Sequence, residues 1–97
     1  MVRHIALFRF RPDLSEAELA GIAAAVEEFL SGYRGLVQAV HGSDLKLREG
    51  NFDYAVSVDF ETTEDYLAYA SDPVHLEMIA KHLAPNMVAR SALQLEY

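Results

Sequence analysis

Tyr69 and His75 are the residues whose types and spacing best permit chemistry. Between them lies Asp72-Pro73, and because Asp is a favoured helix N-cap and Pro a favoured first residue, a helix is predicted to begin at Pro73. His75 would be its third residue, where the helix dipole disfavours a charged imidazole. A neutral imidazole can accept a proton, and the Tyr69 phenol could hold a substrate oxygen or assist proton transfer. Alternatively, both side chains simply pack a corner between two helices.

The chain has 97 residues, which is the size of one small domain, so residues 1–97 are expected to form a single unit. Hydrophobic residues make up 52% of the sequence, with only three Pro and five Gly, which indicates a packed core. A chain this short buries a modest fraction of its surface, so self-association is expected to help it.

Charge and composition exclude several classes of partner. The net charge of −7 argues against nucleic acid and anionic membranes. There is no cysteine, and therefore no disulfide, thiolate metal site or cysteine nucleophile. Neither a signal-peptide core nor a membrane-length apolar run is present, so a cytoplasmic protein is predicted.

The hydrophobic pattern predicts the order βαββααβ. Residues 2–10 and 54–60 alternate like half-buried strands, and Ser15 with Glu18 has the form of a capping box at the start of the first helix. The other expected elements are a first helix ending near residue 30, helices from about 63 to 70 and 73 to 83, and strands over about 36–42 and 88–97.

This order predicts an α+β, ferredoxin-like βαββ(αα)β fold with a four-stranded antiparallel sheet, because crossovers of one hand place all helices on one face. The first and third strands are expected to be central neighbours, parallel to each other. The face without helices would carry apolar Ile5, Leu7 and Ala55. We therefore expect a second copy of the chain to cover it.

Three segments carry a resemblance to a known family: residues 3–10, residues 53–60 and, most specifically, residues 66–75. Together they are similar to the stress-responsive A/B barrel (Dabb) family. The resemblance covers nearly the whole chain in order. It implies a homodimeric α+β barrel, in which two four-stranded sheets enclose the barrel and the helices lie outside.

Within that family the chain resembles polyketide cyclases of the olivetolic acid cyclase type. This implies a cofactor-independent, aldol-type lyase for a hydrophobic or aromatic keto compound, with Tyr69 and His75 as the catalytic pair and His4 in the pocket. Where those cyclases carry a pocket histidine this chain has Tyr54, which is larger and lacks an imidazole, so their substrate is not expected to carry over. A shared fold also hosts many functions.

Aldol chemistry needs a base for the proton next to a carbonyl and a donor for the enolate oxygen. His75 suits the first role, and Tyr69 or Tyr54 the second. His4 could donate to the same oxygen or be a hydrogen-bonded core residue. The side chains expected to bind substrate between sheet and helices, unless they fill that space, are His4, Tyr54, Phe8, Phe29 and Ile79.

The remaining polar residues suggest no further site. His75 and His82 are two helical turns apart, too distant to share a metal, so no metal or other cofactor is expected. His41 is expected to be solvated, as are Glu27 and Glu28. Two interpretations remain open. The first is a cofactor-independent enzyme that acts on a small apolar or aromatic keto compound as a cyclase, isomerase or oxygenase. The second is a non-catalytic dimeric protein that binds a small hydrophobic molecule or serves stress tolerance.

Overall fold

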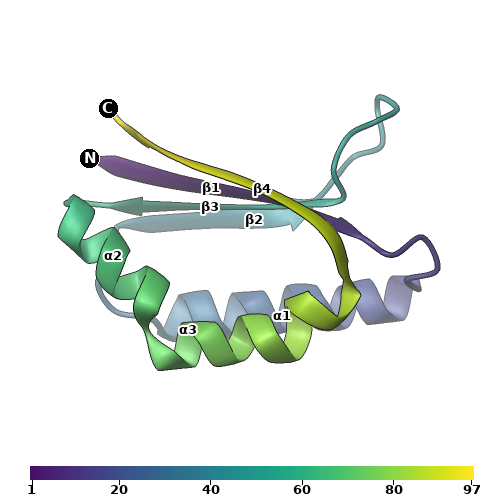
Figure 1. Ribbon diagram of the computed structural model, residues 1–97, viewed down its shortest axis with the longest axis horizontal. Coiled ribbons are helices and arrows are strands. Elements are labelled where there is room, and N and C mark those ends of the chain that lie inside the picture. Colours follow the sequence, from purple (N-terminus) through teal and green to yellow (C-terminus); the bar gives the residue numbers. More distant parts are fainter.

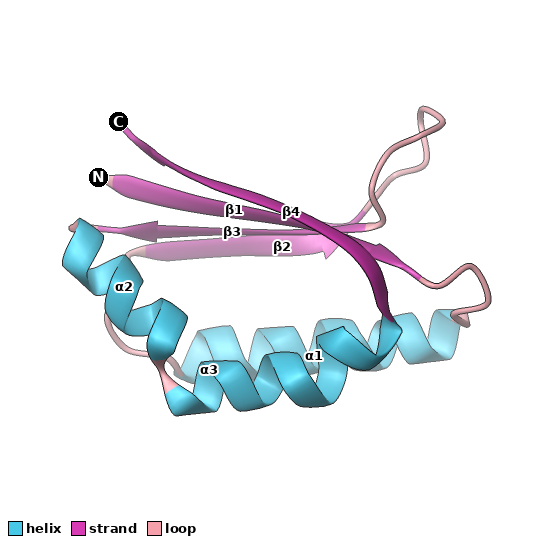
Figure 2. Ribbon diagram, in the orientation of Figure 1, coloured by secondary structure: helices cyan, strands magenta, loops and turns pink.

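The computed structural model describes the whole chain, residues 1–97. One sheet lies above a layer of helices, and both termini lie at the same end of the sheet (Figures 1 and 2). The strands are β1 (Val2–Phe10), β2 (Gln38–Ser43), β3 (Tyr54–Phe60) and β4 (Met87–Glu96). The helices are α1 (Glu16–Gly32), α2 (Thr63–Ser71) and α3 (Pro73–Met78), followed by a π-helical turn η1 (Ile79–Leu83) and a 3₁₀ turn η2 (Ala84–Asn86).

The strand order is β2-β3-β1-β4, and every neighbouring pair is antiparallel. This confirms the ferredoxin-like α+β fold, but the expected parallel pairing of β1 with β3 is wrong. The crossover through α1 makes β1 and β2 run the same way, and the β2–β3 hairpin then reverses the chain. Because β3 lies between β1 and β2, it is antiparallel to both.

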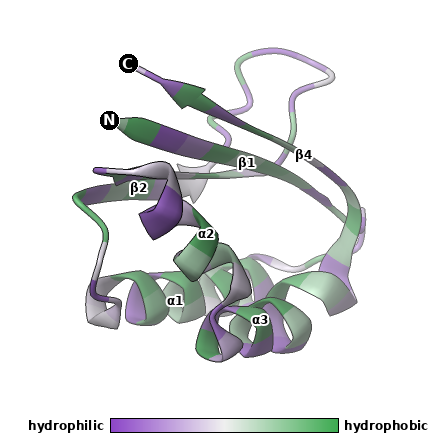
Figure 3. Ribbon diagram, turned by 60° about the vertical axis from the view of Figure 1, so that its left-hand side comes forward, coloured by the Kyte–Doolittle hydropathy of each residue, from purple (hydrophilic) through white to green (hydrophobic).

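The core lies between the sheet and α1. The side chains of β1 alternate between buried and partly exposed, so that one face is buried against the helices. Hydrophobic colours cover much of the strand (Figure 3). Ile22, Val26 and Leu30 of α1 meet this face. The predicted capping box begins α1: the Glu18 backbone N–H donates to Ser15 Oγ (3.1 Å), and the Ser15 N–H donates to the Glu18 carboxylate (2.9 Å).

The last helical segment differs from the single helix expected over residues 73–83. It is α-helical only to Met78 and then widens into the π-helical turn η1. Asn86 Nδ2 donates to the carbonyl oxygen of His82 (3.1 Å), which ties down the end of that turn before β4 begins. Such π turns inside helices are frequent at functional sites.

The helix-free face of the sheet is largely apolar. In an antiparallel sheet, directly paired residues share a face, so Val40, Ser57, Ile5 and Leu93 form one row across all four strands. Val40 and Leu93 are more than half exposed in the single chain. The Arg3 guanidinium and the Asp59 carboxylate pair at 2.7 Å at the end of this face.

None of the helices combines the length and the hydrophobicity that a membrane-spanning segment requires. The cytoplasmic location stays a prediction.

Replacing Ser15 by Ala should lower the free energy of unfolding by about 1 kcal/mol, because the Glu18 N–H loses its acceptor at the start of α1. Urea denaturation measures this. The matched control is Ser31→Ala at the other end of α1, where the exposed hydroxyl only donates to a carbonyl oxygen within the helix. That change should stay within about 0.5 kcal/mol. Equal losses in both variants would contradict the role of the capping box.

Candidate functional site

A tight corner between α2 and α3 positions the two candidate residues. Asp72 ends α2, where its backbone N–H donates to the Tyr69 carbonyl oxygen (3.3 Å), and it also caps α3, where its Oδ1 accepts from the Val74 N–H (2.8 Å). Pro73 begins α3, as predicted. Tyr69 and His75 therefore face each other across the corner, with ring centroids 4.1 Å apart.

Aromatic rings surround this pair on several sides. The Phe60 ring on β3 lies 5.2 Å from that of Tyr69, and the Phe29 ring on α1 lies 5.4 Å from that of His75. Tyr69 is 3% exposed and His75 is 9% exposed. Because the surrounding groups are largely apolar, the polar atoms of the pair lie in a poorly solvated environment.

Burial sets the protonation state of His75. It lowers the pKa of the imidazole, with a smaller contribution from the Arg90 charge, while the Ala70 carbonyl and the Asp72 carboxylate oppose the shift. His75 is therefore neutral near pH 7, and burial is the main cause. Its Nδ1 is fully buried and makes no well-formed hydrogen bond, although the Ala70 carbonyl lies near enough to the imidazole to raise its pKa. A buried polar atom in this state is rare, and a ligand or catalytic role is one explanation for it.

Tyr69 is a donor. Burial raises the pKa of its phenol well above the usual value, with further contributions from the neighbouring Tyr66 and Tyr33. The hydroxyl therefore keeps its proton at neutral pH and can donate it in a hydrogen bond.

His4 on β1 is the third polar residue beside the pair. Its ring lies 5.0 Å from that of Tyr66 and 6.1 Å from that of Tyr69. Gln94 Nε2 on the neighbouring β4 donates to His4 Nδ1 (3.0 Å), an arrangement that leaves the proton of the neutral ring on Nε2. Burial, together with the charges of Arg90 and His75, lowers the pKa of His4 to about 4.

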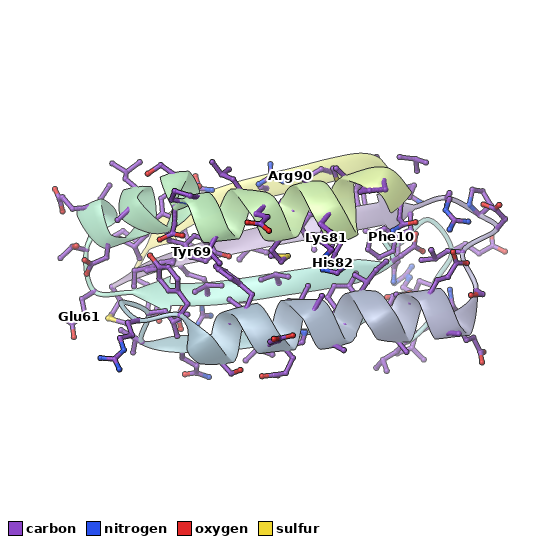
Figure 4. The ribbon with its side chains drawn as sticks, turned by 90° about the horizontal axis from the view of Figure 1, so that it is seen from below. Phe10, Glu61, Tyr69, Lys81, His82 and Arg90 are labelled. Atoms are coloured by element: carbon purple, nitrogen blue, oxygen red, sulfur yellow. The ribbon has the colours of Figure 1, made fainter.

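These three residues line one small enclosed cavity of about 40 Å³ between the sheet and the helices. That volume holds a water-sized group or a carbonyl end, but no aromatic ring. Arg90 of β4 also lines the cavity. Figure 4, viewed from the helix side, shows Tyr69 between the two helical rows and Arg90 towards β4. The other lining residues are apolar: Ala6, Phe8, Val26, Leu30, Val56, Met78, Ile79 and Leu83.

The predicted site residues divide into two groups. His4, Phe8 and Ile79 line the cavity with Tyr69 and His75. Phe29 packs against both members of the pair, yet it lies in an outer groove between α1 and α3. Tyr54 does not line the cavity.

Tyr54 belongs instead to a separate hydrogen-bonded chain. Its hydroxyl pairs with His41 Nδ1 on β2, and His41 Nε2 lies 3.0 Å from the Glu27 carboxylate on α1. The expectation that His41 is solvated is therefore wrong, because its side chain is only 13% exposed. The sequence could not reveal this, since the pairing of β2 with β3 and the rotation of α1 bring the three residues together.

Arg90 and Gln94 were missed by the sequence reasoning. Both lie in a strand that was predicted, and their two-residue alternation places them on one face. What the sequence lacked was the register, which sets Arg90 opposite Phe8 and Gln94 opposite His4. No group of three or more His, Cys, Asp or Glu side chains is arranged to hold a metal ion.

Fold and site together describe a ferredoxin-like α+β protein with a small, mostly apolar cavity that contains a few polar groups beside its α2–α3 corner. The sequence model of the Stress responsive A/B Barrel Domain family (Dabb) matches residues 2–96, and the chain belongs to this family. No protein of curated function matches the sequence. The resemblance to olivetolic acid cyclase is not confirmed by these comparisons.

Solved structures support the same assignment. A dimeric ferredoxin-like protein of unknown function from Thermobifida fusca is 30% identical, with a TM-score of 0.89 over 99% of this chain and 90% of that chain. A hydroxynitrile lyase from Passiflora edulis is 26% identical, with a TM-score of 0.81 over 97% of this chain and 90% of that one. A Dabb family protein from Mesorhizobium loti, 16% identical with a TM-score of 0.84 over 99% and 95% of the two chains, shares the fold.

A histidine NMR titration should place the pKa of His4 at about 4 and that of His75 below 6.5. Because the folded chain then binds fewer protons than the unfolded chain, stability should fall as the pH drops from about 6.5 to about 4. His4 alone should contribute on the order of 3 kcal/mol to this loss. His4→Gln should flatten the dependence. A pKa above 7 for His75 would contradict the assignment of a neutral base.

Proposed function

We propose that the protein is a cofactor-independent enzyme of the lyase type, which makes or breaks a carbon–carbon bond next to a carbonyl group. The observation that carries this proposal is the contact between a neutral, incompletely hydrogen-bonded His75 and the protonated Tyr69 at an enclosed cavity. His75 can accept a proton, and the Tyr69 hydroxyl can donate a hydrogen bond. Enolate chemistry requires these two groups, a base and a hydrogen-bond donor.

In the bond-forming direction, His75 takes the proton from the carbon next to the carbonyl, and the electron pair moves onto the carbonyl oxygen. The Tyr69 hydroxyl stabilises that oxygen, and the Nε2–H of His4 is a second donor on the same cavity. The enolate carbon then attacks a second carbonyl, whose oxygen takes up the proton from the His75 imidazolium, so that His75 is neutral again. The reverse sequence cleaves the bond.

The hydroxynitrile lyase of similar structure fits this class of reaction. A hydroxynitrile is the cyanide adduct of a carbonyl compound, so its cleavage also requires a proton to leave an oxygen as a carbon–carbon bond breaks. The cavity fits the carbonyl end of a substrate, and any larger hydrophobic portion, as in a polyketide, would have to extend beyond it.

We further propose that two copies associate through the helix-free face of the sheet. Val40, Leu93 and Leu95 of this face are 40–59% exposed in the single chain. Apolar surface of this extent is stabilised by burial against a partner. Three proteins of similar structure, from Thermobifida fusca, Bacteroides fragilis and Jannaschia, are described as dimeric.

The catalytic proposal is tested by cleavage of two small neutral substrates, diacetone alcohol and acetone cyanohydrin. His75→Ala and Tyr69→Phe should each reduce turnover by about 10²–10⁴-fold with the fold intact by circular dichroism. The double variant should be little worse than either single variant, because the two groups act as a unit. Chelator should have no effect.

Tyr33→Phe is the matched control for Tyr69→Phe. The Tyr33 ring packs edge-on against Tyr69 at 5.4 Å, but Tyr33 lines the outer groove and not the cavity. It should turn over both substrates at the wild-type rate. No turnover by the wild-type chain, or equal rates in all variants, would favour the non-catalytic, ligand-binding interpretation.

Sedimentation equilibrium at micromolar protein should give about twice the monomer mass. Leu93→Asp should yield a folded monomer, because Leu93 is 54% exposed in the single chain and the carboxylate is buried only in the dimer. Leu67→Asp, at a 57% exposed position on α2, is the control that should remain dimeric. A wild-type monomer, or a Leu93→Asp dimer, would rule out this interface.

A further inference from the structure

Arg90 is a charged residue at the cavity that the mechanism above does not use. It lies on β4 directly opposite Phe8, and because paired residues share a face, it belongs to the side of the sheet that faces the helices. Its side chain is exposed, yet Arg90 lines the same cavity as His4, Tyr69 and His75. It therefore connects the enclosed space with solvent.

The charge of Arg90 is not neutralised within the chain. Arg3 pairs with Asp59, Arg11 pairs with Asp13, and Arg9 donates to the Gly50 carbonyl and lies over the Phe52 ring. Arg90 makes no ion pair and no hydrogen bond of this kind. The residues lining the cavity include no Asp or Glu.

The charge of the Arg90 guanidinium also affects the pKa values of the buried groups in the site. Its positive charge helps to lower the pKa of both His4 and His75, and it opposes the rise in the pKa of Tyr69. The polar groups of the cavity are otherwise neutral near pH 7. Arg90 is therefore the only charged group on the cavity lining, which favours a ligand that brings an anion, although the Asp72 carboxylate outside the lining acts on His75 with the opposite sign.

We propose that Arg90 is the anchor for a carboxylate and that the site takes a short oxo- or hydroxycarboxylic acid. This inference deepens the proposed function and rests on it for the identity of the reacting end. The planar fork of the guanidinium matches a carboxylate with two parallel hydrogen bonds. The carbonyl or hydroxyl end enters the cavity towards Tyr69 and His75, and the carboxylate stays at the mouth.

The test compares binding of pyruvate with binding of pyruvamide, which has nearly the same shape but no charge, by titration of the histidine NMR signals. Pyruvate should shift the signals of His4 and His75 and bind at least about tenfold more tightly than pyruvamide, the difference expected for hydrogen bonds to a charged group. Arg90→Gln should remove that preference, and Arg90→Lys should restore only part of it.

Arg34→Gln is the matched control, because Arg34 is also exposed without an ion pair but lines the outer groove. It should bind pyruvate like the wild type. Undiminished pyruvate binding by Arg90→Gln, equal affinity for both ligands, or no pyruvate binding at all would overturn the proposal. These outcomes can be distinguished from those of the catalytic test. Selective binding of pyruvate without turnover of any substrate refutes only the proposed lyase activity. Turnover of the neutral substrates without a preference for pyruvate refutes only the role of Arg90 as carboxylate anchor.

Discussion

The double role of Asp72 is the constraint on which the site depends. Its backbone closes α2 and its carboxylate opens α3, so the chain turns within one residue. Pro73 cannot continue α2 because it lacks the N–H that the helix would need, and its fixed φ favours a new helix start. This corner brings Tyr69 and His75, six positions apart, to a centroid distance of 4.1 Å. A continuous helix would place them on different turns, too far apart for this contact.

The same burial that makes the corner stable also prepares its chemistry. Apolar neighbours on three elements exclude water, which disfavours the charged forms of both histidines and of the tyrosine. A neutral imidazole beside a protonated phenol is the useful combination for moving a proton near a carbonyl. The cost of this environment is the unsatisfied His75 Nδ1, which a ligand could relieve.

The sequence predicted the elements better than their contacts. The alternation in β1 and β3, the Ser15 capping box and the Asp72-Pro73 corner are local signals, and each is present in the structure. Strand direction and register depend on contacts between distant segments. For that reason the orientation of β1 against β3 was wrong, Arg90 was missed, and His41 was expected in solvent although it bonds Tyr54. The π-helical turn η1 has no sequence signal that the pattern analysis could use.

The most direct test of the account is a crystal structure of the protein soaked with hydroxyacetone, a small neutral ketone. We expect electron density in the cavity, with the ketone oxygen within hydrogen-bond distance of the Tyr69 hydroxyl and a polar atom of the ligand close to the His75 imidazole. An empty cavity, or one filled by the Met78 and Ile79 side chains, would contradict the claim that this corner is a reactive site.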